Sequence, residues 1–552
     1  MERTSKRGQK KRRCYIFVIG GVMSGVGKGV ATASIGALLK ARGLKVTAVK
    51  VDPYLNVDPG TMNPVEHGEV FVTRDGLETD QDLGNYERFL DEDLNKNSCM
   101  TSGSVYLTVI NRERALGYGG RTVEAVPHIP LEIISRLKKA AKDADADVTL
   151  IEIGGTVGEY QNIMFLEACR MMQIEARKSV FVILVGYLPV LSSVGEMKSK
   201  PTQYACRTLN TAGLQPDMIV CRSTHPVDAP RKQKISTSCN VDLEDVISAP
   251  DLESIYEVPL KFDKENVTDR IIEKLELVKK PAKMDDWINL NKRIKASKTP
   301  VRIGVVGKYF STGDFVLSDS YLSVLEAIKH ACWFVHRKPE IIWLNSEDFE
   351  QRPETLEPNL KELDGIIIPG GFGTRGVEGK LETIRYAREN KIPYLGLCYG
   401  MQLALIEAAR NLLGWEDANT YEINPEAKHP VICLMEEQVD KVKGSDYGAS
   451  MRLGSYPCEV KEGTKAWELY GKPLIHERHR HRYEANPKYR KEMEEKGVVF
   501  SGLSPDGKLA EIIEYRDHPF FMASQFHPEF QSRPFHPHPL FLGFIKAAAG
   551  IK

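Results

Sequence analysis

The sequence lacks three features that would each point to a special environment. Its 552 residues contain no run of about 20 apolar residues, so the sequence predicts no membrane-spanning helix. The 10 cysteines form no C-x-x-C pair and are too sparse for a disulfide scaffold, so we expect reduced thiols in a cytoplasmic protein. Basic and acidic residues balance at 75 each, so there is no overall basic excess to favour nucleic acid as a partner.

The remaining composition is that of an ordinary globular protein, with 42% apolar and 27% charged residues. A chain of this length predicts two or more domains. Residues 1–14, "MERTSKRGQKKRRC", are basic, and the apolar run that follows breaks at Gly20 and Gly21 without a cleavage site for a signal peptide. We therefore expect a solvated basic tail, with a nuclear or RNA-contacting tail as the alternative.

Short β-branched runs alternate with helical stretches along the first half of the chain. The predicted strands are 45–52, 147–155, 179–185 and 217–223. Residues 29–43 have apolar positions at helical spacing and end at Gly43. This order is typical of βαβ units and of strands buried on both faces of a parallel sheet.

The character of the sequence changes at residues 279–300, which are polar, charged and bounded by prolines. A second series of strand-like runs follows at 301–309, 365–371 and 393–400. We predict two α/β domains, a P-loop-like domain over 15–278 and a second domain over 301–552, joined by the 279–300 linker. No repeat of solenoid length is present.

The stretch "GGVMSGVGKGVATAS" (20–34) follows an apolar run and opens a helical pattern, as a phosphate-binding loop does. Lys28 can reach phosphate oxygens, but Gly29 stands where such loops carry a hydroxyl for magnesium. Carboxylates must then replace it, and Glu152 and Asp82 are the best candidates. The alternatives are a glycine-rich connection for the loop and a solvated carboxylate for Asp82.

The segment "GLCYG" (396–400) has the form of a nucleophile elbow between a strand and a helix. Downstream, His527 and Glu529 stand two residues apart, as a base and the group that orients it do. The backbone N–H groups of Gly371 and Phe372 are offered by "IIIPGGFG" for an oxyanion. Cys398 alone would favour a buried structural thiol, but the combination favours a thiol nucleophile.

The stretch "IHERHRHRYE" (475–484) resembles a metal cluster at first sight. Strand alternation separates His479 and His481 from the arginines at 478, 480 and 482. No four-ligand zinc spacing is present, so we predict an arginine that binds a carboxylate substrate.

Together these motifs resemble the CTP synthase family over nearly the whole chain. The matching segments are "GGVMSGVGKG", "KVDPYLNVDPGTMNPVEHGEVFV", "ETDQDLGNYERF", "VPHIP", "IEIGGTVGE", "GEMKSKPTQ", "VVGKY", "PGGFGTRGVEG", "GLCYGMQ", "ERHRHRYE" and "QFHPEF". The resemblance implies a synthetase domain and a class I glutaminase domain. Glutamine would be hydrolysed through a thioester, and its ammonia would pass internally to UTP activated by ATP.

The resemblance also implies roles for individual residues. The implied catalytic residues are Cys398, His527, Glu529, Lys28 and Lys50. ATP would contact Gly25, Val26, Gly27, Lys28, Gly29, Val30 and Asp82, with magnesium on Asp82 and Glu152. UTP or CTP would contact Ser24, Glu159, Tyr160, Gln161, Lys198, Ser199, Lys200, Pro201, Thr202, Gln203 and Lys234. Glutamine would contact Gly371, Tyr399, Gly400, Met401, Gln402, Glu422 and Arg482, with Gly371 and the Tyr399 backbone forming the oxyanion hole.

The resemblance further implies GTP as an allosteric activator and a homotetramer that in many members forms filaments. The chain departs from the family at four places: Tyr399 replaces leucine, residues 117–120 read Gly-Tyr-Gly-Gly, Gln161 replaces glutamate, and Ser238 replaces an aromatic residue. We expect weaker feedback by CTP, and either a weakened GTP response with leaky ammonia transfer or normal closure of the loop through Tyr118 and Arg121.

Two alternatives to UTP amination remain open. One is an amidotransferase with a different acceptor, such as a cobyrinate-type or dethiobiotin-synthetase-like ligase, against which "KSKPTQ" argues. The other is a non-catalytic filament or switch protein, which the intact set of catalytic residues opposes.

Overall fold

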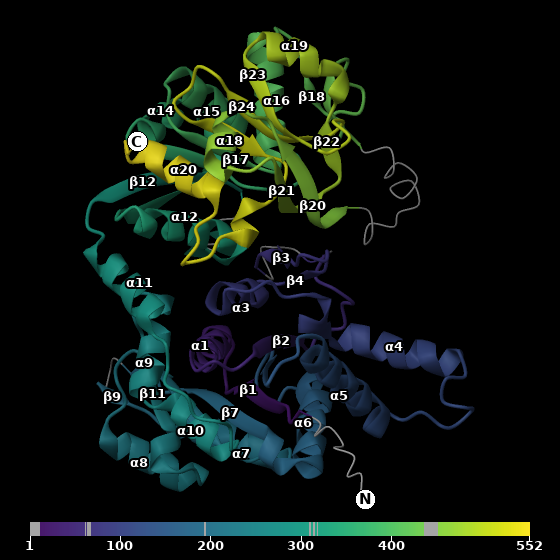
Figure 1. Ribbon diagram of the computed structural model, residues 1–552, viewed down its shortest axis with the longest axis vertical. Coiled ribbons are helices and arrows are strands. Elements are labelled where there is room, and N and C mark those ends of the chain that lie inside the picture. Colours follow the sequence, from purple (N-terminus) through teal and green to yellow (C-terminus); the bar gives the residue numbers. More distant parts are fainter. Residues whose placement is uncertain are drawn as a thin grey trace, which may run out of the picture. The chain divides into compact units, whose positions relative to one another are not determined.

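The computed structural model describes residues 11–60, 62, 68–191, 195–308, 311–312, 315–316, 318–434 and 451–551. The chain forms two compact units (Figure 1). The first contains residues up to 58 together with 85–291, and the second contains 59–84 together with 292–552. Residues 1–10 of the predicted basic tail lie outside the described residues, and the following Lys11 pairs with Asp147 at 2.8 Å.

The first unit is built on a seven-stranded sheet in which every strand pair is parallel. In sheet order the strands are β11 (Val246–Pro250), β10 (Met218–Ser223), β7 (Val180–Tyr187), β1 (Cys14–Gly20), β6 (Val148–Ile153), β2 (Val46–Asp52) and β5 (Cys99–Thr101). The four predicted strands and the predicted helix are confirmed, the helix as α1 (Lys28–Ala41). The central strands are buried on both faces, which explains their continuous β-branched sequences.

Helices cover this sheet and account for most of the remaining residues of the unit. They are α4 (Ser102–Arg114), α5 (Ala125–Asp143), α6 (Ile163–Glu175), α7 (Lys200–Thr211), α8 (Ala229–Cys239), α9 (Val258–Lys264) and α10 (Val267–Lys274). The division of the chain into units falls within α3 (Asp82–Leu90) and within α11 (Asp285–Ala296). A single apolar core joins one face of the sheet to α4 through α8. Helix α11 lies inside the predicted linker.

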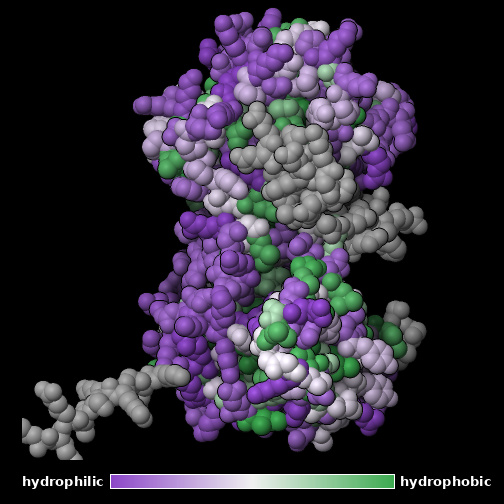
Figure 2. Space-filling view, turned by 90° about the vertical axis from the view of Figure 1, so that its right-hand side faces the viewer, coloured by the Kyte–Doolittle hydropathy of each residue, from purple (hydrophilic) through white to green (hydrophobic). Residues whose placement is uncertain are grey.

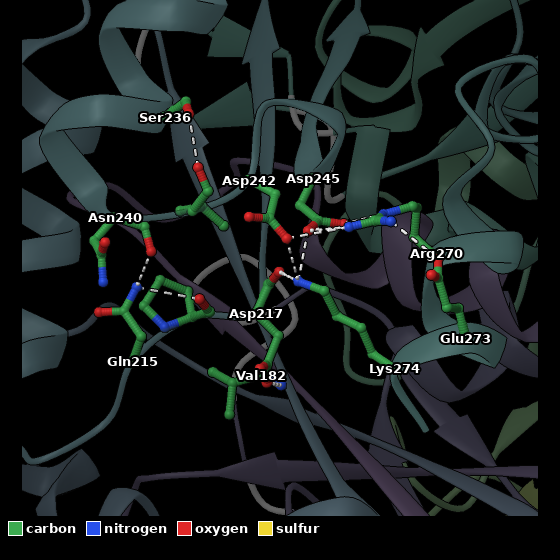
Figure 3. A network of polar contacts seen from close by, with 12 residues as sticks. Val182, Gln215, Asp217, Ser236, Asn240, Asp242, Asp245, Arg270, Glu273 and Lys274 are labelled. Atoms are coloured by element: carbon green, nitrogen blue, oxygen red, sulfur yellow. Dashed lines mark hydrogen bonds and ion pairs between the residues drawn. The ribbon is translucent and has the colours of Figure 1, made fainter. Parts of the chain in front are cut away.

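A network of ion pairs holds α10 to the edge of the sheet (Figure 3). Arg270 Nε lies 2.9 Å from the buried Asp245 Oδ1, and Lys274 Nζ lies 2.5 Å from Asp245 Oδ2. Burial raises the pKa of Asp245, but hydrogen bonds from Arg270 and Lys274 outweigh it and lower this pKa overall. Lys274 also donates to the backbone oxygen of Asp217 at 2.9 Å, which ties the start of β10 to the same helix.

The second unit contains a nine-stranded mixed sheet. Its strands in sheet order are β15 (Lys338–Asn345), β12 (Pro300–Gly307), β16 (Gly365–Ile368), β17 (Tyr394–Leu397), β25 (Phe521–Ser524), β24 (Ala510–Tyr515), β23 (Val498–Leu503), β20 (Arg452–Val460) and β21 (Leu474–His481). Pairing is parallel from β15 to β25 and antiparallel beyond it. The predicted α/β class is therefore confirmed for both units.

Smaller elements complete this unit. The helices are α12 (Leu322–Phe334), α13 (Ser346–Gln351), α14 (Leu356–Leu360), α15 (Val377–Glu389), α16 (Tyr399–Leu412), α18 (Lys465–Tyr470), α19 (Arg490–Glu495) and α20 (Pro539–Ala548). A three-stranded sheet combines β18 (Asn419–Thr420), β19 (Pro430–Leu434) and β22 (Tyr483–Ala485), and the hairpin of β3 (Val70–Val72) and β4 (Glu78–Asp80) comes from the N-terminal half of the sequence.

Candidate active sites

Cys398 occupies a strained turn between β17 and α16. Its backbone has φ of 49°, which is rare for a residue with a side chain, and its N–H donates to Ser524 O at 2.7 Å. The flanking glycines are required by space, because a Cβ at Gly400 would lie 2.3 Å from Ile368 O and one at Gly396 would lie 2.7 Å from the Tyr394 hydroxyl. The elbow predicted from "GLCYG" is thus present, and the N-terminus of α16 lies at the thiol.

His527 and Glu529 form the expected pair just after β25. His527 Nδ1 lies 2.7 Å from Glu529 Oε1, and a Cβ at Gly370 would meet His527 Cε1 at 2.8 Å and Cys398 Cβ at 3.7 Å. Burial lowers the pKa of His527, but the charges of Glu529 and Cys398 outweigh it and raise this pKa to about 10. A protonated imidazole beside a sulfur suits a thiolate–imidazolium pair.

These groups open onto one cavity of about 210 Å³ within the second unit. The predicted residues that line it are Gly371, Phe372, Cys398, Arg482, His527 and Glu529. The other predicted glutamine contacts, Tyr399, Gly400, Met401, Gln402 and Glu422, are not among its lining residues, and Met401 belongs to the hydrophobic core.

Two of these side chains, those of Glu422 and Gln402, form hydrogen bonds with neighbouring backbone groups. Glu422 Oε1 accepts from Gly373 N at 2.9 Å, and burial raises the pKa of this carboxyl despite the opposing effects of Gly373, Lys308 and Arg482. Gln402 Nε2 donates to Tyr483 O at 2.9 Å.

The alternation predicted for 475–484 is observed in β21. His479 Nδ1 and His481 Nε2 lie 2.9 Å apart, whereas Arg478 and Arg480 contact the 59–84 segment. Arg480 Nε lies 2.8 Å from Glu78 Oε1, and the Arg480 guanidinium lies 5.3 Å from the centre of the Phe372 ring.

The 59–84 segment is a wall of this cavity that sequence reasoning missed. Gly60, Glu69 and Val70 line it, and Glu69 accepts from Ser323 N at 3.1 Å. The acidic residues Glu69 and Glu78 in "HGEVFVTRDGLE" could have indicated a functional segment, since both are buried. Their partners at 323 and 480 are far away in sequence, so the contacts themselves could not be predicted.

In the first unit, the predicted phosphate-binding loop follows β1 and ends at the start of α1. Gly25 and Gly27 have φ of 69° and 87°, a conformation that favours glycine. The first helical residue, Lys28, is buried and its Nζ lies 2.7 Å from Gly155 O at the end of β6. Gly29 is buried in the first turn of α1 and offers no side-chain oxygen.

The two predicted magnesium ligands fall in different units. Glu152 is buried on β6, 4.0 Å from Lys50 Nζ on the neighbouring β2, and it accepts from the Tyr86 hydroxyl. Asp82 is grouped with the second unit, begins α3 one turn before Tyr86, and its N–H donates to Asp80 Oδ1 at 2.9 Å. Within the described residues, no group of three or more histidine, cysteine or acidic side chains could hold a metal.

A second cavity of about 200 Å³ lies beside the predicted phosphate-binding loop, and sequence reasoning missed most of its wall. Gly27, Val30 and Ala31 line it, together with Arg222, Ala249, Pro250, Asp251, Leu252, Ser254, Ile255, Val258, Lys261 and Phe262. The available signal was position, since Arg222, Ala249 and Pro250 lie at the carboxyl ends of β10 and β11 and residues 251–262 come after β11, where parallel sheets bind ligands.

The residues predicted to contact UTP or CTP lie in the first unit, mostly around the start of α7. The buried Thr202 donates from Oγ1 to Tyr187 O at 3.0 Å, and Gln203 donates to Ser199 Oγ at 3.0 Å. Lys198 pairs with Glu196 at 2.5 Å. Pro201 is in the first turn of α7, and the exposed residues of this set are Ser24, Tyr160, Gln161, Lys200 and Lys234.

The unusual Glu159-Tyr160-Gln161 stretch is organised around its glutamate. Glu159 Oε1 accepts from Thr156 N at 2.6 Å, and Gln161 donates to Glu159 Oε2 at 2.8 Å. The Tyr160 side chain is 92% exposed, so it is available to a ligand or a partner.

The glycine-rich 117–120 loop joins α4 to α5. Gly119 and Gly120 have φ of 64° and 74°, and a Cβ at Gly117 would lie 2.5 Å from Arg112 Cγ. The Tyr118 ring packs on the Arg112 guanidinium at 5.7 Å and edge-on against His128 at 5.2 Å. The glycines are therefore compatible with a turn that Tyr118 anchors.

Comparison with known proteins gives one consistent answer across the chain. The family described as "CTP synthase N-terminus" matches residues 14–277, and "Glutamine amidotransferase class-I" matches residues 316–547. The CTP synthase of Caldanaerobacter subterraneus subsp. tengcongensis is 51% identical over 539 residues, which is 98% of both chains. That of Bacillus subtilis is 49% identical over 539 residues, 97% of this chain and 98% of the relative.

Among solved structures, the glutaminase domain of Trypanosoma brucei CTPS with bound acivicin is 37% identical. It covers 46% of this chain and 95% of its own, with a TM-score of 0.43. In the part of the chain that the structure describes, no helix is both long and apolar enough to cross a bilayer.

Proposed function

Because the chain belongs to the CTP synthase family, we propose that it aminates UTP to CTP with ATP, taking the nitrogen from glutamine. The C-terminal unit releases ammonia from glutamine, and the N-terminal unit uses it. This reaction is the last step that supplies a cytidine nucleotide in de novo pyrimidine synthesis.

In the glutaminase reaction, Cys398 attacks the side-chain amide carbon of glutamine. His527 takes the thiol proton and returns it to the leaving nitrogen, which departs as ammonia, while Glu529 holds the imidazole in place. Water then hydrolyses the thioester to glutamate. The Gly371 and Tyr399 N–H groups stabilise the oxyanion in both steps, as the position of Gly371 in the cavity wall supports.

Glutamine is held at its two ends by charged and polar groups. Arg482 in the cavity wall binds the α-carboxylate through its forked guanidinium. Glu422 and Gln402 accept from the α-ammonium. Both Gln402 amide hydrogens have acceptors, Tyr483 O at 2.9 Å and Gln525 Oε1 at 3.2 Å, so its Oε1 is the atom that remains for the substrate.

In the synthetase reaction, residues 25–30 bind the ATP phosphates and Lys28 contributes its charge. Asp82 and Glu152 would hold magnesium, whose charge screens the phosphates during transfer; the buried Glu152 carboxylate provides the oxygen ligand that this ion prefers. Lys50 lies beside Glu152 and stabilises the charge that develops as the 4-oxygen of UTP is phosphorylated. UTP is bound by the residues predicted for it, at 24, 159–161, 198–203 and 234. The second cavity accommodates the ATP base.

Regulation and assembly belong to the same proposal. GTP activates glutamine hydrolysis, and we expect the altered 117–120 loop to weaken this response unless Tyr118 compensates. CTP inhibits more weakly than in relatives, because Gln161 and Ser238 replace a charge and a ring.

The chain assembles as a homotetramer through its first unit. The face that carries α4, α5 and α6 shows hydrophobic surface in Figure 2, and exposed apolar side chains support a buried contact there. They include Leu107, Ile110, Leu131, Tyr160 and Ile174.

The observation that carries the proposal is that Cys398, His527 and Glu529 line one cavity in a chain 51% identical to a CTP synthase over 98% of its length. The test is CTP formation by the purified enzyme from UTP, ATP and magnesium with glutamine or ammonium chloride. We expect CTP with either nitrogen source and none without ATP. Amination of another acceptor, with UTP unused, would contradict the proposal.

A further inference from the structure

Gln525 precedes His527 by two residues and has a fully buried side chain. Its Nε2 lies 3.7 Å from Cys398 Sγ, and its Oε1 lies 3.2 Å from Gln402 Nε2. Its backbone N–H donates to Glu511 O at 2.9 Å, which fixes the residue to β24. The mechanism above gives Gln525 no role, although its side chain contacts the reacting sulfur.

The hydrogen-bond network determines which end of the Gln525 amide faces the sulfur. Tyr483 O can only accept, so the Gln402 atom 2.9 Å away from it must be the amide nitrogen. The other hydrogen of that nitrogen points to Gln525, which must therefore present its oxygen to Gln402. The Gln525 N–H group is then the one that faces Cys398.

Two polar groups around the sulfur act in opposite directions. The carbonyl oxygen of Arg480 lies 3.7 Å from Sγ, where it accepts from a thiol and repels a thiolate. The Gln525 N–H does the reverse, because it donates to a thiolate and gains strength from the negative charge. Since the site is buried, both effects are stronger than they would be in water.

We propose that Gln525 is a further catalytic residue of the glutaminase site, which stabilises the Cys398 thiolate by donating a hydrogen bond to Sγ. The inference rests on the proposed function, because it requires Cys398 to be the nucleophile. His527 takes the thiol proton, the Gln525 N–H holds the resulting thiolate, and this bond weakens as the sulfur forms its bond to the amide carbon of glutamine. Through Oε1, the same side chain positions Gln402.

The test measures the reactivity of Cys398 directly, without relying on turnover. Full-length wild type, Gln525→Leu and Gln525→Glu are treated with iodoacetamide between about pH 5 and pH 10, and mass spectrometry follows alkylation of the Cys398 peptide. Gln531→Leu is the matched control, because this nearby glutamine donates to Glu477 and to His476 O. Circular dichroism and thermal unfolding report folding in each variant.

We expect the pH midpoint of alkylation to rise by at least about one unit in Gln525→Leu, as the loss of one hydrogen bond to a charged group predicts. It should rise further in Gln525→Glu, because a carboxylate beside the sulfur repels a thiolate. The kcat of glutamine hydrolysis near neutral pH should fall about tenfold or more in both variants. Gln531→Leu should match wild type in both measurements.

An unchanged alkylation midpoint in folded Gln525→Leu would overturn the inference, even if turnover fell. Should this variant fail to fold, Gln525→Glu, which preserves the shape of the side chain, is used instead. A raised alkylation midpoint would then support the inference, and an unchanged one would overturn it. A wild-type enzyme that does not hydrolyse glutamine would contradict the proposed function instead, while the alkylation midpoints would still report on the contact between Gln525 and the sulfur.

Discussion

The turn at Cys398 and the proposed phosphate-binding loop each lie between a parallel strand and a helix, but their backbones differ. At the elbow, Cys398 itself takes φ of 49°, so a residue with a side chain bears the strain and its sulfur is displayed. In the loop, Gly25 and Gly27 adopt the left-handed conformation, where glycine bears no such strain. Backbone strain is therefore present in the turn that displays the Cys398 side chain. It is absent from the loop in which backbone N–H groups are proposed to bind the ligand.

The two sites also differ in how their charges are distributed. Cys398, His527 and Glu529 all belong to the second unit and contact one another or the same cavity. The two carboxylates proposed to hold magnesium do not belong to one unit, since Glu152 is in the first unit and Asp82 is grouped with the second. We therefore expect glutamine hydrolysis to survive changes that abolish synthesis, and ammonia-dependent synthesis to survive the loss of the thiol.

The largest expected effect comes from Cys398→Ala. Glutamine-dependent CTP formation should fall at least about a thousandfold, because no other group in the proposed mechanism forms the thioester. Ammonia-dependent formation should stay within about twofold of wild type, since free ammonia enters the synthetase reaction directly. Loss of both activities in a folded protein would contradict the separation of the two sites.

The next largest effect is expected for Glu152→Gln and for Asp82→Asn. Each should lower CTP formation at least about a hundredfold with either nitrogen source, because each removes a charged oxygen ligand for magnesium. Basal glutamine hydrolysis, measured without nucleotides, should persist. Glu175→Gln, an exposed carboxylate of the same unit as Glu152, is the control and should keep full activity. Wild-type synthesis by either test variant at saturating magnesium would refute that residue's assignment.

A smaller effect is expected where the 59–84 segment meets the glutaminase site. Glu78→Gln removes the charge that pairs with Arg480 at 2.8 Å, so the guanidinium loses the partner that holds it beside the Phe372 ring. Glutamine-dependent CTP formation should fall about tenfold, with ammonia-dependent formation unchanged.

The control for this change is Asp75→Asn, which removes a carboxylate at the turn of the same β3–β4 hairpin. It should retain both activities, because Asp75 accepts from Thr73 within the hairpin. An equal loss in both variants would show that the hairpin matters as a whole and that the Glu78–Arg480 pair has no separate role.

The last effect concerns stability instead of activity and comes from Lys380. In the described part of the chain its ammonium has no hydrogen-bond partner, and it lies 5.4 Å from the centre of the Tyr399 ring. Burial lowers the pKa of Lys380 to about 7. Between this value and the free-lysine value near 10.4 the folded chain binds fewer protons than the unfolded one, so stability rises with pH across that range and the penalty is complete below about pH 7.

Lys380→Met should therefore raise the free energy of unfolding by about 2–4 kcal/mol at pH 7, and the gain should shrink toward pH 10. Denaturant unfolding at both pH values measures it. A gain of equal size at pH 7 and pH 10 would show that packing, not the buried charge, is responsible.

The sequence revealed those parts of the sites that depend on local geometry. The elbow at Cys398 and the loop ending at Lys28 are each encoded by a few adjacent residues, because glycines and a following helix suffice to form them. The strands were also predictable from adjacent residues, because burial on both faces of a sheet requires a continuous run of apolar side chains.

The contacts that were missed join residues far apart in sequence. Glu78 meets Arg480 across 402 positions, and Gln525 meets Cys398 across 127. Neither contact leaves a periodicity or spacing that can be read from one chain. The wall of the second cavity at Arg222 and 249–262 was missed because a cavity of this kind is formed where strands end and has no sequence motif of its own.

The most direct test of the two-site account follows the nitrogen itself. The enzyme is given UTP, ATP, magnesium and glutamine labelled with ¹⁵N at its side-chain amide, in the presence of excess unlabelled ammonium, and the CTP is analysed by mass spectrometry. The account predicts ¹⁵N in the exocyclic amino group of CTP made by wild type, far above its fraction in the medium, and only unlabelled CTP from Cys398→Ala. Wild-type CTP carrying ¹⁵N only in proportion to the mixed ammonia pool would contradict internal transfer between the two sites.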